Sequence, residues 1–277
     1  MLEVNGLSKR LTDGKEILRN ISFRVGKGEF VALLGASGAG KSMTMRAIVG
    51  LTSVTSGQVV FTGETGKTYT TTTASGKELR RARRNIGVIF QSGNLVRRLP
   101  VLDNVMIGRL GRINPLRSWL YGFTDREARD AMDALDRVGL ADFASRTTGT
   151  LSGGEMQRVA IARAIFQKPL FYLADEPIAS LDPKNAEIIM KLLQPLAREN
   201  PILGAFHQPE MVTRYCTRVI ALKKGAVIYD GDPHLKSSQL GEIYAAADQQ
   251  ECSPAVTSLE MTNKESAYLV EQPGASW

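Results

Sequence analysis

Apolar and polar positions alternate in the first part of the chain. Apolar side chains alternate from Leu2 to Val4, those of Ile21, Phe23 and Val25 share one face of a second segment, and Val59 to Phe61 form a third segment. Alternation with a period of two is typical of strands that bury one face and expose the other. We therefore expect these segments to form an antiparallel sheet.

Four other short segments follow a different pattern, because each is apolar throughout and stops at a polar residue. Continuous apolar strands are typical of a parallel sheet that is covered on both faces. Ligands of such sheets bind beyond the carboxyl ends of the strands, so one site is expected where the four strands end. Phe30 to Leu34 leads into a glycine loop and Lys41, Ile86 to Phe90 into Gln91, Leu170 to Ala174 into Asp175 and Glu176, and Ile202 to Phe206 into His207.

The pattern between Gln91 and Leu151 is helical instead. Thr124 to Glu127 fits a capping box, in which a Thr and a Glu three residues later satisfy the first free amides of a helix. Apolar residues share one face of the helix that follows, and Gly139 is placed to stop it. We expect an inserted helical subdomain at about residues 92–160, within a main domain of residues 1–244.

The remaining segments are simpler. Val219 to Tyr229 is predicted to be an apolar hairpin that turns at Lys223, Lys224 and Gly225. The Thr-rich segment Tyr69 to Gly76 is predicted to be a loop between a strand and a helix. From about Ala245 the sequence is polar and aperiodic, so residues 245–277 are expected to form a flexible tail.

Charge and composition narrow the function classes. The 277 residues carry a net charge of +7, which favours anionic partners such as nucleotides, nucleic acid or a lipid surface. The two cysteines, Cys216 and Cys252, lack metal-ligand spacing and indicate a reduced compartment. No apolar run approaches the ~18 residues of a membrane span, and the N-terminus lacks the apolar region of a signal peptide, so a soluble chain is expected. One basic cluster is interpreted as a solvated face: Arg80, Arg81, Arg83 and Arg84.

A glycine-rich loop carries the strongest chemical signal. It matches the phosphate-loop pattern G-x-x-x-x-G-K-[S/T] directly after a predicted strand and before a helix, which is the required context. The glycines let successive amides wrap phosphate groups, Lys41 reaches the outer two phosphates, and the hydroxyl of Ser42 can bind Mg²⁺. A glycine turn that matches by chance is the alternative, and it does not explain this context. The predicted nucleotide-binding residues are Gly35, Ala36, Ser37, Gly38, Ala39, Gly40, Lys41 and Ser42.

Polar residues at the other strand ends complement this loop. Mg²⁺ on a nucleotide takes one or two carboxylates, so Asp175 is expected to hold the metal through water. Glu176 lies next to it and is expected to orient or deprotonate the attacking water. A helix cap is the alternative for the two acids. His207 is expected to donate to the γ-phosphate and Gln91 to act through the metal or the water, whereas ordinary polar strand ends are the alternative for both.

The stretch LSGGEMQRVAIARAI runs from Leu151 to Ile165. From Glu155 onward it is predicted to be an amphipathic helix, which is entered through Ser152, Gly153 and Gly154. Ser152 and Glu155 fit a second capping box. That box does not explain Gly153 and Gly154, because a glycine costs about 1 kcal/mol relative to Ala within a helix and is useful mainly where backbone must approach something closely. A helix start with bare amides attracts an anion.

Taken together, the phosphate loop, Gln91, the LSGGE motif, the FYLADE strand, the segment Ser180 to Asp182 and His207 occur in the order of the ATP-binding subunits of ABC transporters. The chain resembles this family from about Leu2 to Asp232. The resemblance implies an α/β fold of the P-loop NTPase type, with a RecA-like mixed sheet, an N-terminal antiparallel β subdomain and an ABC-specific α-helical subdomain. It also implies hydrolysis of ATP with Mg²⁺.

In that family two copies sandwich ATP head to tail. Ser152, Gly153 and Gly154 of one copy are therefore expected to face the γ-phosphate held by the loop of the other copy. Asp182 resembles the residue that crosses the same interface. Glu176 resembles the general base, with His207 and Gln91 as further catalytic residues, and the expected metal site comprises Ser42, Gln91 and Asp175.

Two positions depart from the family pattern. Leu11 stands where the family commonly has an aromatic residue that stacks on adenine, and Met43 stands where it usually has Thr. Stacking of a base on an aromatic ring is worth ~1 to 3 kcal/mol, so weaker or less selective ATP binding is expected. Neither change removes a catalytic group.

Three segments resemble the ATPase subunits of phosphonate importers: Asn94 to Arg112, Arg117 to Phe123 and Ala174 to Pro183. Relatives that import phosphite, phosphate esters or amino acids share much of this outline. The resemblance implies membrane permease subunits as partners, an indirect link to a periplasmic or lipoprotein substrate-binding protein, and no nucleic-acid partner. It implies a peripheral location on the cytoplasmic face of the inner membrane.

The segment after Gln91 is then expected to form the groove for a permease helix, with Trp119, Tyr121 and Phe123 nearby. Packing of these aromatics within the helical subdomain is the alternative. Three other functions are alternatives. A soluble ABC-type ATPase that acts on ribosomes or DNA usually has two cassettes or a long coiled coil, and this chain has one cassette and no sustained heptads. Another P-loop class, such as a kinase or GTPase, would not explain LSGGE, and the third alternative is an accessory ATPase of a soluble phosphonate-degrading complex.

Overall fold

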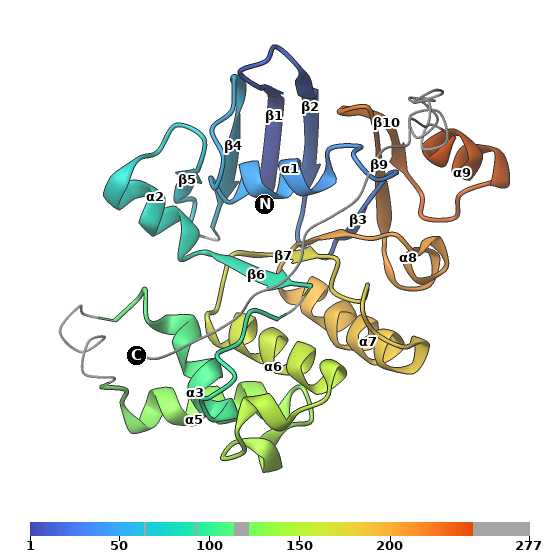
Figure 1. The fold of residues 1–277 in the computed structure, drawn as a ribbon. Helices are drawn as coiled ribbons and strands as arrows, with labels where there is room; N and C mark the ends of the chain where they lie inside the picture. The colour runs from blue at the N-terminus through green and yellow to red at the C-terminus, as the bar shows by residue number, and fades with distance from the viewer. Residues whose placement is uncertain (64, 92, 114–121, 246–277) are drawn as a thin grey trace, which may run out of the picture.

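Two β-sheets and the helices that cover them make up the fold in the computed structural model (Figure 1). The structure describes residues 1–63, 65–91, 93–113 and 122–245. The smaller sheet has the strand order β2-β1-β4-β5, and all its pairs are antiparallel. Its strands are β1 (Leu2–Arg10), β2 (Glu16–Val25), β4 (Ser56–Thr62) and β5 (Thr68–Thr70). The antiparallel sheet predicted from the alternating pattern is confirmed.

The larger sheet has the strand order β10-β9-β3-β8-β7-β6. The strands from β9 to β6 run parallel, and β10 pairs with β9 in the antiparallel direction, so the sheet is mixed. Its strands are β3 (Phe30–Leu34), β6 (Ile86–Phe90), β7 (Phe171–Asp175), β8 (Ile202–Ala205), β9 (Arg218–Lys223) and β10 (Ala226–Gly231). The four predicted parallel strands and the predicted hairpin are therefore present.

Both faces of this sheet are buried, which explains why its strands are apolar throughout. Along β3, Phe30, Ala32 and Leu34 face one hydrophobic core. Val31 and Leu33 of the same strand face a second core, which the sheet shares with the apolar face of the smaller sheet. The alternation of side chains in a strand thus serves two cores instead of one core and solvent.

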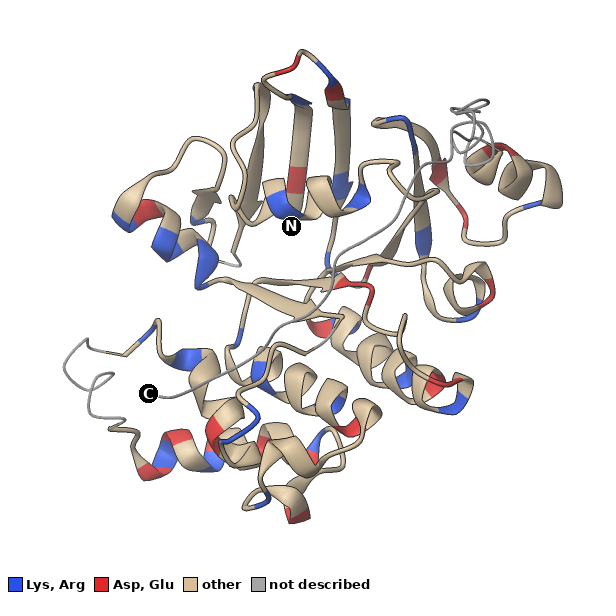
Figure 2. Ribbon diagram, viewed as in Figure 1, with Lys and Arg blue, Asp and Glu red and all other residues tan. Residues whose placement is uncertain are grey.

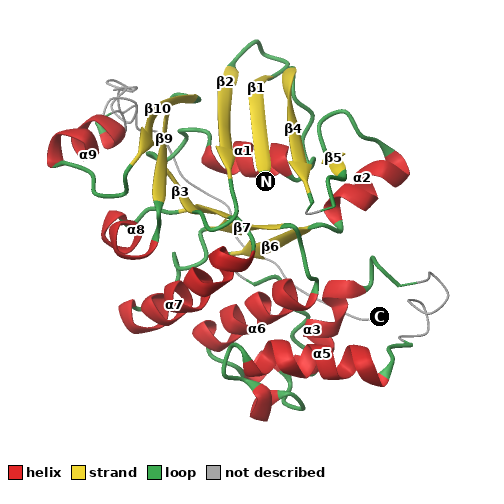
Figure 3. Cartoon of the chain, turned by 180° about the vertical axis from the view of Figure 1, so that it is seen from behind, coloured by secondary structure: helices red, strands yellow, loops and turns green. Residues whose placement is uncertain are grey.

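The helices are divided between these two cores. Figures 1 and 3 show α1 beside the smaller sheet and α3, α5, α6 and α7 gathered on the opposite side of the larger sheet. Apolar residues of α1 and α2 belong to the core between the sheets, and those of the other helices belong to the opposite core. The helices are α1 (Lys41–Ile48), α2 (Gly76–Arg83), α3 (Val101–Met106), α5 (Asp125–Asp136), α6 (Gly153–Phe166), α7 (Pro183–Glu199), α8 (Pro209–Tyr215) and α9 (Ser237–Tyr244), with 3₁₀ turns at Ile107–Arg109, Ala141–Phe143 and Thr148–Thr150.

The inserted helical region contains the predicted capping box. The hydroxyl of Thr124 accepts a hydrogen bond from the backbone of Glu127, and the Glu127 carboxylate accepts from the backbone of Thr124. The helix α5 begins at Asp125, and Gly139 has a φ of +67° three residues after the helix. The bounds proposed for the main domain, the inserted helical subdomain and the tail stay a prediction. Trp119, Tyr121 and the tail after Ala245 lie outside the described residues.

Two local interpretations need correction. The Thr-rich segment is not wholly a loop, because Tyr69 and Thr70 belong to β5 and Gly76 begins α2. The basic cluster lies on and just after α2, where Figure 2 shows several Lys and Arg bands. Arg83 is not solvated like a free surface residue, since its guanidinium donates to the backbone oxygens of Val49 and Gly50.

Cys216 is a buried free thiol, and burial raises its pKa, in agreement with an unreactive role. Cys252 is outside the described residues. Among the helices that the structure describes, none is long and apolar enough to cross a membrane.

Candidate nucleotide-binding site

The glycine loop joins the end of β3 to the start of α1. Gly38 and Gly40 have φ values of +76° and +108°, a backbone region in which a residue with a Cβ is strained. At Gly35, whose φ is +152°, a Cβ would lie 2.4 Å from the backbone oxygen of Leu222. The helix α1 starts directly after Gly40, and no side-chain hydrogen bond caps its first turn. Its first N–H groups are therefore free to bind an anion.

Lys41 is the buried cation of this loop, and the residue is only 5% exposed. Its ammonium donates to the backbone oxygens of Gly35 at 2.5 Å and Ala36 at 3.2 Å. Burial lowers the pKa of Lys41, and the nearby carboxylates of Glu176 and Asp175 oppose that shift. A buried cation is costly unless an anion compensates it, so the site is suited to a phosphate group.

A cavity of about 810 Å³ opens beside the loop. This volume lies within the range of known small-molecule sites, roughly 300–1,000 Å³. Basic side chains outnumber acidic ones in its lining, which suits a polyphosphate. The lining comprises Lys15, Glu16, Ile17, Arg19, Ala36, Ser37, Gly38, Ala39, Gly40, Lys41, Ser42, Met43, Arg46, Glu176, His207, Leu222, Lys223, Lys224 and Ile243.

The turn between β9 and β10 forms one wall of this cavity. Its Gly225 donates from the backbone to Ala39 at 3.0 Å and accepts from the backbone of Arg19 at 2.7 Å. A Cβ at position 225 would lie 2.2 Å from the backbone oxygen of Ile17, so only glycine permits this close approach. The contact brings the lysines of the turn next to the phosphate loop.

Two further strand ends place a carboxylate and an imidazole in the same cavity. The Nε2 atom of His207 lies 2.6 Å from a carboxylate oxygen of Glu176. Glu176 has a φ of +50°, which is unusual for a residue with a side chain, and its backbone N–H donates to Ala205 at 3.2 Å. Backbone strain of this kind is concentrated at functional sites, where surrounding structure holds it in place.

Asp175 is half-buried at the end of β7. Burial raises the pKa of its carboxyl group most, the neighbouring Glu176 raises it further, and Arg46 and Lys41 lower it. The charges of Glu176, Arg46 and Lys41 act on Asp175, so it lies near the phosphate loop, although it is not among the residues that line the cavity.

Gln91 and Leu11, which the sequence also predicts for this site, are not among the residues that line the cavity. Gln91 donates from Nε2 to the hydroxyl of Ser180 at 3.2 Å, which ties the end of β6 to the loop after β7. Leu11 is 37% exposed, and its backbone N–H donates to Lys15. Leu11 does not line the cavity, whereas Ile17 does. Lys41, Glu176 and His207 therefore share the cavity, and the fourth strand end, Gln91, does not.

The LSGGE motif forms the start of α6, as a capping box. The hydroxyl of Ser152 accepts from the backbone of Glu155 at 3.3 Å, and the Glu155 carboxylate accepts from the backbone of Ser152 at 2.8 Å. That backbone hydrogen bond and the one from the Ser152 hydroxyl hold the pKa of Glu155 below its usual value. The predicted box is confirmed.

The two glycines of the motif have different surroundings. A Cβ at Gly154 would lie 2.5 Å from Oδ1 of Asn185, so packing within the chain requires glycine there. A Cβ at Gly153 would come no closer than 3.8 Å to Leu181, which is an ordinary contact, and Gly153 is exposed. Nothing in the described part of the chain requires glycine at position 153.

Asp182 caps the next helix, α7. Its carboxylate accepts from the backbone N–H of Asn185 at 3.1 Å and from the Asn185 side chain at 2.6 Å, and these bonds lower the pKa of Asp182. Neither Asp182 nor any of Ser152, Gly153 and Gly154 belongs to the described lining of the phosphate-loop cavity.

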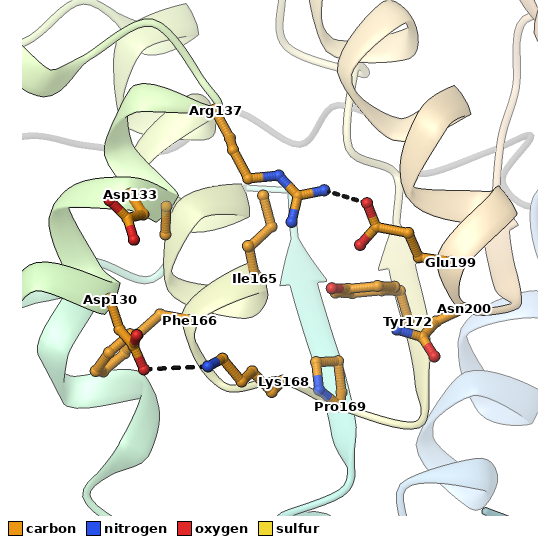
Figure 4. Close-up of a pocket in the computed structure, with 11 residues that line it drawn as sticks. Asp130, Asp133, Arg137, Ile165, Phe166, Lys168, Pro169, Tyr172, Glu199 and Asn200 are labelled. Atoms are coloured by element: carbon orange, nitrogen blue, oxygen red, sulfur yellow. Dashed lines mark hydrogen bonds and ion pairs between the residues drawn. The ribbon is translucent and has the colours of Figure 1, made fainter. Parts of the chain in front are cut away.

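A second cavity, of about 340 Å³, lies between α5, α6 and the end of α7 (Figure 4). Tyr172, near the start of β7, reaches into it, and burial raises the pKa of this tyrosine to about 12. Four charged side chains of the cavity lining form ion pairs, Arg137 with Glu199 at 2.6 Å and Lys168 with Asp130 at 3.1 Å. Tyr172 is near the start of β7 and Asp175 is its last residue. The second cavity therefore lies toward the amino ends of the strands, and the phosphate loop lies at their carboxyl ends.

Sequence reasoning missed several residues of the phosphate-loop cavity. They come from β2 and the residue before it, from α1 beyond the motif, from the end of β9 and the turn after it, and from α9: Lys15, Ile17, Arg19, Arg46, Lys223, Lys224 and Ile243. The net positive charge was the one general signal. Which of the scattered cations gather at the loop depends on how the β9–β10 turn packs on β2, and this packing is not visible in local sequence.

The site combines four features that together define a P-loop ATPase. They are a phosphate loop at the end of a central strand, a buried lysine, and a carboxylate and an imidazole at the ends of neighbouring strands. The antiparallel sheet and the helical region with its LSGGE helix narrow the class to the ATP-binding cassette.

Comparison with known proteins agrees with this class. The profile of the family described as ABC transporter matches residues 18–179. The chain is 42% identical over 263 residues, 94% of this chain and 96% of the relative, to the phosphonates import ATP-binding protein PhnC 2 of Synechococcus sp.. The chain belongs to the ABC transporter family, and it is an ATP-binding subunit whose ATPase activity is coupled to transport.

Two solved structures support the fold. CbiO1 from Clostridium perfringens, part of the ABC transporter complex CbiONQ, is 32% identical with a TM-score of 0.72, over 84% of this chain and 88% of that chain. The ATP-binding cassette MJ0796, in a dimeric post-hydrolysis state bound to ADP and Pi, is 30% identical with a TM-score of 0.69, over 85% of this chain and 100% of that chain. The predicted fold class is confirmed.

Proposed function

We propose that this chain is the ATPase subunit of a phosphonate importer, and that two copies hydrolyse ATP at sites they share. One observation carries the shared site. The cavity of a single chain holds Lys41, Glu176 and His207, but the exposed glycine Gly153 and the cap residue Asp182 lie outside it. The dimeric cassette MJ0796 provides the precedent for a second copy.

The residues at the cavity fit ATP as the substrate. Lys41 is a buried ammonium, and the bare first turn of α1 offers N–H groups for the phosphates. Met43 keeps its backbone amide in the first turn of α1, where its side chain also lines the cavity. We propose that Ile17, which lines the cavity, makes an apolar contact with the adenine base. Leu11 does not line the cavity.

Two residues at or near the phosphate loop fit Mg²⁺. A serine hydroxyl at Ser42 and a carboxylate at Asp175 are the oxygen ligands that this ion prefers. Asp175 carries a raised pKa because its charge is half-buried, and a bound cation would relieve that cost. When bound, Mg²⁺ supplies charge neutralisation on the phosphates. Gln91 is proposed to join this site after releasing its hydrogen bond to Ser180.

The pair Glu176 and His207 is proposed to carry the chemistry. Glu176 is proposed to orient or deprotonate the attacking water, and its contact with His207 holds its carboxylate in the cavity. His207, 2.6 Å from that carboxylate, is positioned to donate to the γ-phosphate. Loss of the γ-phosphate removes charge that both copies grip, so the dimer opens and the movement drives the membrane subunits.

The variant Glu176→Gln tests the shared site. It retains the size of the side chain and loses the base, so ATP binding should persist, hydrolysis should stop, and an ATP-bound dimer should accumulate. Size measurement with Mg-ATP, compared with the wild-type chain and with ADP, checks this expectation. A strictly monomeric variant that still hydrolyses ATP would contradict the assignment.

Support for phosphonate as the solute is the similarity to PhnC 2, whose name gives that substrate. A permease pair and a substrate-binding protein are the proposed partners, and the cytoplasmic face of the inner membrane is the proposed location. Growth on a phosphonate as sole phosphorus source should require this chain and the permease. Growth that needs the chain but no permease would favour a soluble degrading complex, and loss of growth on phosphite alone would favour phosphite import.

A further inference from the structure

Asn185 links the two parts of the chain that are proposed to reach the ATP of the partner copy. It is the third residue of α7, after the cap residue Asp182 and Pro183. Its Nδ2 donates to Oδ2 of Asp182 at 2.6 Å, and its backbone N–H donates to Oδ1 of the same carboxylate at 3.1 Å. Both oxygens of Asp182 are therefore held by one residue.

The other side of the Asn185 amide faces the start of α6. Because a carboxylate can only accept hydrogen bonds, the NH₂ group must face Asp182 and Oδ1 must face away. A Cβ at Gly154 would lie 2.5 Å from that Oδ1 and 2.7 Å from Cγ of Asn185. The amide group is thus packed between the Asp182 carboxylate and the backbone of Gly154.

This arrangement differs from an ordinary capping box. At the start of α6, the third helical residue is Glu155, and its carboxylate accepts from the backbone of Ser152. A glutamate in the corresponding position of α7 would place a second carboxylate beside Asp182, whereas the amide of Asn185 provides a donor. An asparagine at position 185 can therefore donate a hydrogen bond to the carboxylate of Asp182, the residue that caps α7.

We infer that Asn185 is a positioning residue, which holds Asp182 and the first turn of α6 in one fixed arrangement so that both meet the ATP of the partner copy together. This inference rests on the proposed shared site. Asn185 itself does not line the phosphate-loop cavity within the described residues, so its role is separate from ATP binding by its own chain.

The test uses the full-length Glu176→Gln chain as background and measures two quantities for each variant: ATP binding by the monomer and dimer formation with Mg-ATP. Asn185→Ala should leave monomer binding unchanged and weaken dimer formation roughly tenfold, as expected for the loss of one hydrogen bond to a charged group. Asn185→Asp should weaken it more, because two carboxylates then face each other, and mild acid should restore part of the loss. The matched control is Asn200→Ala, the same change at the far end of α7, which should alter neither quantity.

A second comparison separates positioning from a general packing effect. Gly154→Ala should push the Asn185 amide away from Asp182 and so weaken the dimer. In the double variant Gly154→Ala, Asn185→Ala the nearest contact of the new Cβ is the Cβ of residue 185, at 3.2 Å, so the two losses should be smaller together than their sum. Fully additive losses would mean that Gly154 is required by the partner and not by Asn185.

The outcomes distinguish this inference from the proposed function. If the Glu176→Gln parent dimerises with Mg-ATP and both Asn185 variants dimerise equally well, the positioning role is wrong and the shared site stands. If the parent itself stays monomeric, the shared site is wrong. If Asn185→Ala loses ATP binding as a monomer, Asn185 acts on its own chain and the inference is overturned.

Discussion

At the scale of single residues, the two glycines of the LSGGE motif are required for different reasons. Packing against Asn185 accounts for Gly154, and no contact in the described chain accounts for Gly153. A residue that gains nothing from glycine inside its own chain indicates an external group that must approach its backbone. In the proposed dimer this group is the γ-phosphate.

Gly153→Ala should separate stability from function. The chain should be unchanged or more stable by up to about 1 kcal/mol, because alanine favours the helix and its Cβ meets only an ordinary contact. ATPase activity should fall. Gly154→Ala should instead lose about 1–3 kcal/mol of unfolding free energy through overpacking. Denaturant unfolding and ATPase assays check both, and full activity in Gly153→Ala would contradict an external ligand.

Asp175 yields a pH prediction, since burial raises its pKa above the unfolded value. A raised carboxyl pKa means that the charged form destabilises the folded state, and that this cost fades as the pH falls through the raised pKa. Asp175→Asn should therefore increase the Tm of the nucleotide-free chain at neutral pH, with the gain lost in acid. It should also weaken binding of Mg-ATP.

Asp182→Asn is the matched control for this measurement. Hydrogen bonds from Asn185 lower the pKa of Asp182, so its charged form stabilises the fold above the unfolded pKa and this contribution is lost as the pH falls. The control should thus decrease the Tm at neutral pH. A decrease with Asp175→Asn as well would show that burial is not the dominant influence on Asp175.

The candidate site could be predicted from the sequence where a polar residue comes soon after the carboxyl end of a parallel strand. Lys41, Glu176 and His207 are in the cavity because the carboxyl ends of parallel strands meet at one edge of the sheet. Gln91 also follows a strand, but its hydrogen bond to Ser180 directs it elsewhere in this structure. A side-chain choice between two partners is decided by tertiary packing, which the strand pattern does not contain.

At the scale of elements, the start of α6 combines a structural cap with the proposed contact to the partner. Ser152→Ala removes one half of the capping box and should cost about 1 kcal/mol of stability. The hydroxyl of Ser152 also donates to the Glu155 carboxylate and helps to lower its pKa, in addition to the backbone N–H that the variant keeps. The part of the cost that comes from this hydroxyl is therefore present above the unfolded pKa of Glu155 and is lost as the pH falls through the lowered value. Unfolding at neutral and acidic pH checks this, and an equal cost at both pH values would contradict it.

The elements were more predictable than their edges and contacts. The alternating and continuous apolar patterns differ because one sheet has a single buried face and the other has two, and this difference is written in the hydrophobic sequence. The Thr-rich segment was less informative, since threonine suits strands and turns alike, and pairing with β4 is what makes Tyr69 and Thr70 a strand. Arg83 likewise owes its role to two backbone oxygens distant in sequence.

At the scale of the whole molecule, the proposed dimer contains two sites, each built from the phosphate loop of one copy and the LSGGE helix of the other. Two inactive variants can therefore complement each other. Lys41→Ala should abolish ATP binding by its own loop, and Ser152→Arg should block the partner's site while its own loop still binds ATP. A mixed dimer of these variants combines both defects in one site and leaves the other site intact.

Each variant alone should be inactive, and the equimolar mixture should regain a clear part of the wild-type ATPase rate. The regained rate should depend on protein concentration, because it requires association. Size measurement must show that mixed dimers form. The control is Lys41→Ala alone at the same total protein concentration. Mixed dimers that form and stay inactive would contradict independent shared sites. A Ser152→Arg chain that is active alone would show that the LSGGE helix takes no part in the reaction, because hydrolysis would then need only the loop and strand ends of one chain.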